Sequence, residues 1–211
     1  MFVLYEEDGA FKAGTILADN QATLQVENTH GKRVKLKRAN VLLEFREPGP
    51  ADLLSRAEAG AEELDIEFLW EVCGDDEFAF ADFAAEYQGH PPSAVEAATL
   101  LLRLHSAPIW FHRKGKGRFR KAPAEILQAA LAGLEKKRQQ AAAIEHMRAE
   151  LVDGRLPAEI AALLPQALYR PDRNRPEIKA LEAACVDSGL STARLLLNLI
   201  SQHEMDITEV S

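Results

Sequence analysis

The sequence predicts an α+β protein that is mostly helical, with a small N-terminal antiparallel β-barrel, a winged helix-turn-helix and a C-terminal helical region. Three observations favour this fold. Residues 1–45 alternate β-branched runs with turn dipeptides, apolar residues recur at helical spacing after residue 50, and a basic segment containing glycines separates two helical stretches. Because 211 residues exceed the usual ~100 to 150 of one domain, three units are predicted, over residues 1–47, 50–123 and 124–211.

Five short strands are predicted at residues 2–5, 11–18, 22–27, 33–37 and 41–45. Dipeptides typical of β-turns, such as Asp8-Gly9 and His30-Gly31, separate them. The fourth strand alternates Val34 and Leu36 with cations, so that one of its faces is basic. We expect the strands to curl into a closed barrel, because wrapping leaves no long exposed edge.

Helices and a hairpin follow. The first helix has an apolar stripe over residues 53–64, Asp65 is placed to cap a second, and a third ends at Gly89. Ser93 and Glu96 form a capping-box pattern that begins a fourth helix, ending at about residue 105. The hairpin at residues 108–121 completes the order of a winged helix-turn-helix, with the hairpin as the wing.

The glycines of this hairpin predict its register. A three-residue loop from Gly115 to Gly117, with Gly117 in the left-handed conformation, pairs Lys114 with Arg118. Two faces result. The core face carries Ile109, Phe111 and Phe119, and the opposite face carries Trp110, His112, Lys114, Arg118 and Arg120.

The C-terminal region is predicted to be helical throughout. A long helix covers residues 124–153, a helix of about a dozen residues ends at residue 168, and a helical hairpin covers residues 177–187 and 191–202. Gly154 and Pro157 end the long helix, and Gly189 is the predicted C-terminal cap within the hairpin.

The charges are strongly segregated. The net charge is −8, and residues 48–110 hold thirteen carboxylates against two arginines. Residues 106–124 hold six cations and no acid, and residues 29–43 hold five cations and no acid. Cations concentrated in this way repel one another unless a negative partner lies against them.

This pattern predicts two surfaces that bind nucleic acid. Cations interleaved with aromatic rings offer phosphate anchors and stacking surfaces for a single strand. The predicted binding residues are Trp110, His112, Arg113, Lys114, Lys116, Arg118, Arg120 and Lys121 in the hairpin, and Lys32, Arg33, Lys35 and Lys37 in the fourth strand. The alternative for both surfaces is a solvated face that only keeps the protein soluble.

Other functions find less support. The helix from Ser93 lacks the side chains that read base edges, which argues against a winged-helix DNA regulator. Asp75-Asp76-Glu77 and Asp82 are interpreted as favourable charges at a helix N-terminus rather than as metal ligands, and Cys73 and Cys185 as core residues. No catalytic or metal residue is predicted. A protein-interaction adaptor, with the acidic stretch binding a basic partner, remains an alternative. With no membrane span, no signal peptide and only two cysteines, we expect a cytoplasmic protein.

The run of residues 79–134, including HSAPIWFHRKGKGRFRKAPAEIL, resembles the N-terminal region of bacterial exoribonucleases of the ribonuclease II (RNB) family. The segments FVLYEEDGAFKAGTILADN and LYRPDRNRPEIKALEAAC are similar to parts of the same proteins. The resemblance is to a divergent branch with a helix-turn-helix in place of paired cold-shock barrels.

The resemblance implies degradation of RNA from the 3′ end, with release of nucleoside 5′-monophosphates. In that family a later domain carries clustered aspartates that hold magnesium, and it is expected beyond Ser211, so that no catalytic residue and no cofactor is assigned to this chain. We read the chain as a fragment or a truncated frame. Its expected task is to bind single-stranded RNA and to guide it toward the catalytic domain of the same parent protein.

Overall fold

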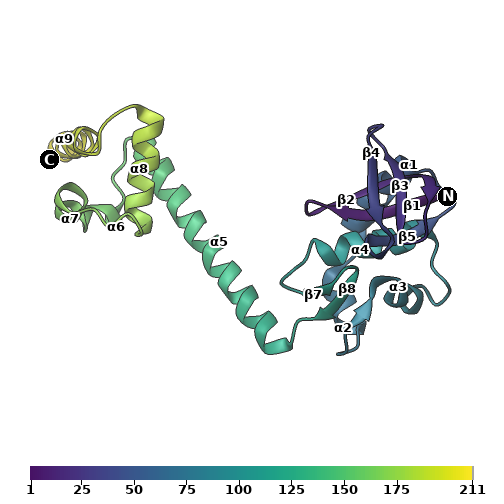
Figure 1. The fold of residues 1–211 in the computed structure, drawn as a ribbon. Helices are drawn as coiled ribbons and strands as arrows, with labels where there is room; N and C mark the ends of the chain where they lie inside the picture. The colour runs from purple at the N-terminus through teal and green to yellow at the C-terminus, as the bar shows by residue number, and fades with distance from the viewer. Residues whose placement is uncertain (211) are drawn as a thin grey trace. The chain divides into compact units, whose positions relative to one another are not determined.

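A computed structural model describes residues 1–210, with the side chains of residues 1–202 and 204. It confirms a mixed α+β protein that is mostly helical, with 54% helix and 21% strand (Figure 1). The chain forms two compact units, Met1–Ala129 and Ala130–Ser211. Within the part that the structure describes, no helix is both long enough and apolar enough to cross a membrane.

The first unit begins with five antiparallel strands: β1 (Phe2–Glu7), β2 (Ala10–Asp19), β3 (Thr23–Asn28), β4 (Arg33–Lys37) and β5 (Val41–Phe45). All five predicted strands are therefore present. The predicted closed barrel is wrong, because the sheet order is β4-β3-β2-β1-β5 and β4 and β5 remain as separate edges. A short 3₁₀ turn, Arg38–Asn40, connects these two edge strands. Helices cover part of the sheet, so that burial of its apolar side chains does not need closure.

Both faces of this sheet are apolar. On one face Leu4, Ala13 and Phe45 belong to a core shared with the following helices. On the other face β1, β3 and β4 bury a cluster of their own, which includes Tyr5 and Val26. The strands come unusually close at Gly14, where a Cβ atom would lie 2.5 Å from Val26 Cγ1 and 2.6 Å from the Glu27 carbonyl oxygen.

Four helices and three short strands complete the first unit. They are α1 (Pro50–Glu63), α2 (Ile66–Val72), β6 (Phe78–Ala79), α3 (Phe80–Gln88), α4 (Ala94–His105), β7 (Phe111–Gly115) and β8 (Arg118–Lys121). The predicted caps are confirmed. The Asp65 carboxylate accepts two backbone N–H groups at the start of α2, Ser93 and Glu96 form the capping box of α4, and Gly89 is left-handed at the end of α3.

The strand β6 was not predicted, and it changes the setting of the hairpin. It pairs with β8 to give a second antiparallel sheet in the order β6-β8-β7. The acids Asp75, Asp76 and Glu77 therefore precede a strand, and their interpretation as charges at a helix N-terminus is wrong. Only Asp82 lies in the first turn of α3.

The helix α4 lies at the centre of the first unit. It contacts α1 and α3 as well as β5 and β7. Every one of its residues is at least partly buried. On α1, Gly60 has no side chain where α4 passes, and a Cβ atom there would lie 3.0 Å from Thr99 Cγ2. The helix therefore serves as core.

The second unit is built from helices. The long helix α5 (Ala124–Val152) begins in the first unit and is followed by α6 (Ala158–Ala161), α7 (Leu164–Tyr169), α8 (Pro176–Ser188) and α9 (Thr192–Val210). The single predicted helix ending at residue 168 is instead two short helices. Pro165 stands at the start of α7, because its ring has no N–H to donate in a helix interior. Gly189 is left-handed, which confirms the predicted cap.

Gly14→Ala should destabilise the first unit by about 1 to 3 kcal/mol, because its methyl group would collide with the β3 backbone and not only with a movable side chain. Denaturant unfolding followed by tryptophan fluorescence measures this, since both tryptophans, Trp70 and Trp110, lie in the first unit. The control is Gly74→Ala, where a Cβ atom meets no atom within 4 Å. Equal stability of the two variants would contradict the close approach.

Candidate nucleic-acid interface

The hairpin β7–β8 is held against the body of the first unit by its central aromatic residues. Phe111 and Phe119 are buried in the shared core, and Phe119 pairs with Phe78 of β6. The Phe80 N–H donates to the Gly117 carbonyl oxygen at 2.9 Å, and Gly117 is left-handed, as predicted, with φ of 66°. A Cβ atom at Gly117 would lie 2.9 Å from the Phe80 ring, so the loop depends on glycine for space and for conformation.

The register of the hairpin follows the prediction except next to the loop. Arg118 pairs with Gly115 and Phe119 with Arg113, so that Lys114 is the extra residue at an irregularity between them. The predicted pairing of Lys114 with Arg118 is therefore wrong. Gly115 lies opposite Arg118 next to the turn. The extra residue, Lys114, forms a bulge one position earlier in β7. His112 and Arg120 pair directly and share one face, as expected.

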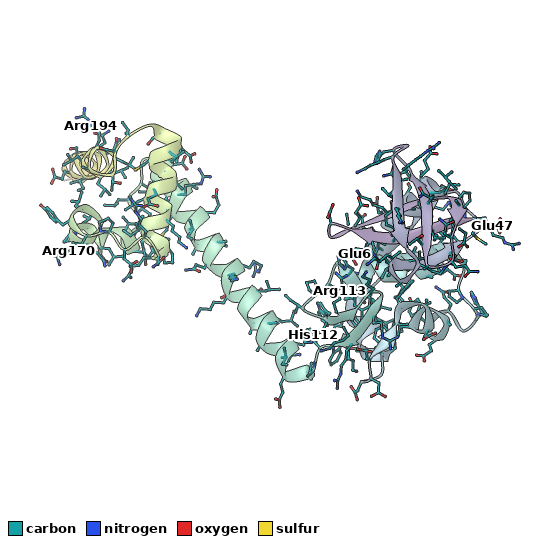
Figure 2. All side chains as sticks on the ribbon, viewed as in Figure 1. Glu6, Glu47, His112, Arg113, Arg170 and Arg194 are labelled. Carbon is teal, nitrogen blue, oxygen red and sulfur yellow. The ribbon has the colours of Figure 1, made fainter. Side chains whose placement is uncertain are left out.

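Most cations of the hairpin have partners within the first unit. Arg113 forms an ion pair with Glu6 of β1, and both residues are labelled in Figure 2. Lys116 donates to the Asn40 side chain. Arg118 Nε lies 3.0 Å from the Glu77 carboxylate. Arg120 Nε donates to the Asp75 carbonyl oxygen at 2.9 Å. The predicted repulsion among these cations is thus relieved by nearby oxygens.

Lys121 has a structural role. Its ammonium group lies 4.5 Å from the centre of the Trp70 ring and 3.7 Å from the Asp75 carboxylate, and it donates to the Trp70 carbonyl oxygen at 3.4 Å. The Trp70 indole in turn donates to the Ala122 carbonyl oxygen at 2.9 Å. These contacts join the end of β8 to α2, so Lys121 is the least available of the hairpin cations.

The aromatic side chains of the predicted site are also partly buried within the first unit. Trp110 precedes β7, is half-buried and packs against the shared core, and its carbonyl oxygen accepts the Ala122 N–H at 2.8 Å. His112 is half-buried. Among the described residues, Trp110, His112 and Lys114 are the hairpin site residues whose side chains make no hydrogen bond or ion pair.

The basic strand β4 presents a different picture. Arg33, Lys35 and Lys37 are exposed and alternate with half-buried Val34 and buried Leu36, as predicted. Lys32 is exposed in the preceding turn. In the part of the chain that the structure describes, none of these four cationic side chains makes an ion pair or hydrogen bond. They form the β4 stripe: Lys32, Arg33, Lys35 and Lys37.

Geometry makes the β4 stripe suitable for a polyanion. The strand is an edge of the sheet, and alternate side chains stand about 7 Å apart on one face. The opposite residues on β3 are Thr23, Gln25 and Glu27, so one carboxylate stands across from Arg33 and none from the two lysines. Exposed lysines also keep an edge strand from pairing with another chain, which is the competing explanation of the stripe.

Arg38, the fifth cation of this block, belongs to the fold. It forms ion pairs with Asp19 and, at 2.7 Å, with Glu44, and its Nε donates to the Gln21 carbonyl oxygen at 2.5 Å. The hydrogen bond from Arg38, together with the one from the Gln21 N–H, lowers the pKa of Asp19. Arg38 thereby fixes the turn between β2 and β3 to the end of β4, and it leaves its four neighbours to solvent.

The partners Glu6, Asp75 and Glu77 were not anticipated from the sequence. They stand 41 to 107 residues from the cations that they meet, and no local pattern links residues so far apart.

Among the described residues, no group of three or more His, Cys, Asp and Glu side chains is arranged to hold a metal ion. Comparison of the chain with protein-family models, with curated proteins and with solved structures found no match.

Cys73 should react slowly with alkylating reagents. It ends α2 in the core, and burial raises the pKa of its thiol to about 11; the charge of Lys121 opposes this shift, and the charges of Glu86 and Asp75 add to it. Raising the pKa from its usual 9.0 lowers the thiolate fraction at pH 8 by about 100-fold. Mass spectrometry after iodoacetamide treatment, with the unfolded chain as the control, measures the difference. Equal rates for Cys73 in the folded and unfolded chain would contradict its burial.

Proposed function

We propose that this chain is the RNA-binding, substrate-guiding region of a ribonuclease II-like 3′–5′ exoribonuclease and has no catalytic activity by itself. Its partners in this proposal are single-stranded RNA and the catalytic domain of the same parent protein, which supplies the magnesium site. The setting is the cytoplasm. The resemblance of residues 79–134 to that family motivates the proposal.

The β4 stripe is the observation that carries it. Four exposed cations without partners make the electrostatic potential positive at this edge of the sheet, although the net charge of the protein is −8. Neutralising phosphates by such cations releases counterions, which is the main source of affinity in sequence-independent binding. The stripe can act without rearrangement, whereas most hairpin cations must exchange a protein oxygen for a phosphate.

The hairpin extends the proposed interface. Lys114 is without a partner, and the pair of Arg118 with Glu77 is exposed on both sides, so that solvent screens it. A phosphate with two charged oxygens competes well for such an arginine. Arg113, Lys116 and Arg120 are placed to contribute in the same way, and Lys121 and Trp110 then hold the hairpin in position.

The order of elements supports a winged helix-turn-helix with an altered use. The sequence α2, β6, α3, α4, β7 and β8, with sheet order β6-β8-β7, agrees with that assignment. In this reading α4 is the recognition helix, yet all of its residues are at least partly buried between neighbouring elements. A helix in that position cannot enter a major groove, which argues against a DNA regulator and favours contact through phosphates.

Removing the β4 stripe should reduce both affinity and salt dependence. The variant Arg33→Ala/Lys35→Ala/Lys37→Ala should bind a labelled single-stranded RNA with a slope of log affinity against log salt that is smaller by about 2, at ~0.7 per phosphate contact. The control, Lys136→Ala/Lys137→Ala/Arg138→Ala on α5, removes as many charges from another surface.

Fluorescence anisotropy at several salt concentrations measures both variants. An unchanged slope in the stripe variant, together with a reduced slope in Lys114→Ala/Arg118→Ala/Arg120→Ala, would move the interface to the hairpin. No binding by the parent chain at low salt would contradict the proposed function.

The chain alone should leave RNA intact. Hydrolysis of a phosphodiester with magnesium needs clustered carboxylates that hold the ions and activate water, and the described residues contain no such cluster. Incubating end-labelled RNA with the purified chain and magnesium tests this, with a mock purification to detect contaminating nuclease. Stepwise release of nucleoside 5′-monophosphates beyond the mock level would contradict the prediction.

A further inference from the structure

An apolar groove lies between α2 and α3, and none of the residues assigned to RNA lines it. A hollow of about 230 Å³ is lined by Phe68, Val72, Phe83, Glu86 and Tyr87. Three of these side chains are large, apolar or aromatic and well exposed: Phe68 is 49% exposed, Val72 51% and Tyr87 38%. Such a cluster is unusual on helices whose other apolar residues are buried.

Two aromatic side chains in contact form the wall of the groove, and the groove extends beyond the first hollow. The rings of Phe68 and Tyr87 meet edge to face with centroids 6.4 Å apart, which holds both side chains in place. Tyr87 also lines a second hollow of about 100 Å³, together with Leu64 and Val95. Phe68 and Val72 stand one helical turn apart on α2, so the exposed apolar strip runs along the helix.

The segment that forms this strip is acidic. Residues 57–102 contain no lysine or arginine. Its exposed carboxylates include Glu63 at the end of α1, Glu67 and Glu71 on α2, and Asp82 and Glu86 on α3, and Glu86 lines the hollow. Within the described residues none of these five side chains forms an ion pair or a hydrogen bond. Their charge is therefore available to a partner from outside.

We propose that this groove, with Phe68, Val72 and Tyr87 at its centre, binds a cationic amphipathic helix of a second protein. Helices bind grooves through apolar anchors spaced at i, i+3, i+4 and i+7, and lysines or arginines beside those anchors match the acidic rim. The larger hollow, at about 230 Å³, is smaller than the ~300 Å³ or more of most small-molecule sites. It is therefore better suited to a single apolar side chain of a partner helix. The acids also repel RNA, so this surface suits a cationic protein partner and not a polyanion.

The chain offers no suitable helix of its own among the described residues. Its most basic helical segment is Lys136-Lys137-Arg138 on α5, where consecutive side chains point in different directions around the axis. Arg138 is also paired with Glu135 at 2.6 Å. A helix from another protein therefore fits the groove better than a second copy of this chain.

A designed peptide tests the proposal on the full chain. The probe is a labelled 18-residue helix, with leucine at i, i+3, i+4 and i+7 positions and lysine elsewhere. Two control peptides have the same leucines with glutamate in place of lysine, or the same composition in an order without an apolar face. The probe should bind with a salt-dependent affinity, and both control peptides should bind at least about tenfold more weakly.

Two variants locate the binding. Val72→Lys places a cation in the groove and should weaken binding of the probe by about tenfold or more, the effect of losing a central anchor. Val186→Lys, the same substitution at a valine 83% exposed in the second unit, should leave binding unchanged. Circular dichroism and thermal unfolding confirm that both variants fold.

Three outcomes overturn the proposal. The first is equal binding by the probe and the peptide without an apolar face, which indicates attraction by charge alone. The second is equal binding by the Val72 and Val186 variants. The third is self-association of the parent chain in sedimentation experiments that Val72→Lys abolishes, which assigns the groove to a second copy.

Discussion

The pairing of β6 with β8 fixes the arrangement on which the rest of the first unit depends. Two residues, Phe78 and Ala79, form this strand, and Phe78 packs against Phe83, Phe111 and Phe119. Because Phe78 lies opposite Phe119, the preceding Glu77 comes beside Arg118, and Asp75 comes within reach of Arg120 and Lys121. This aromatic contact thus fixes β8 against β6 and brings the acidic residues next to β6 to three of the hairpin cations, while Arg113 and Lys116 find partners on other elements.

The fold of the first unit also separates its charges into those paired within the protein and those exposed to solvent. Carboxylates next to β6 are used within the first unit to hold the hairpin, while those on α2 and α3 around Phe68 and Val72 meet solvent. On the cationic side, Arg38 is held by Asp19 and Glu44, and the β4 stripe is left without partners. Counting charges along the chain cannot make this distinction, because it depends on which surfaces face each other in the fold.

Local features of the fold were predictable from the sequence, and features that need distant contacts were not. The five strands, the caps at Asp65, Ser93 and Gly189, and the left-handed Gly117 follow from short patterns with local causes. A two-residue strand has no periodicity to detect, so β6 was missed. In the hairpin, the pairs His112–Arg120 and Arg113–Phe119 follow the predicted register, and only the irregularity at Lys114 next to the loop was not foreseen. Sheet closure depends on where the helices pack, which the strand pattern does not contain. The internal partners of the hairpin cations were not predictable for the same reason, since they lie far away in the sequence.

The burial of α4 limits how this fold can recognise a nucleic acid. A recognition helix works by exposing side chains to base edges, but here α4 is packed on α1 and α3, and Gly60 leaves room for Thr99 at the crossing. The remaining cationic surfaces are strand edges and a hairpin, whose side chains are suited to phosphates and not to a base sequence. The acids on α2 and α3 repel a polyanion that approaches from their side, and the β4 stripe attracts it. The electrostatic field of the first unit therefore favours the approach of a polyanion from the side of the β4 stripe, through contacts that do not distinguish one base sequence from another.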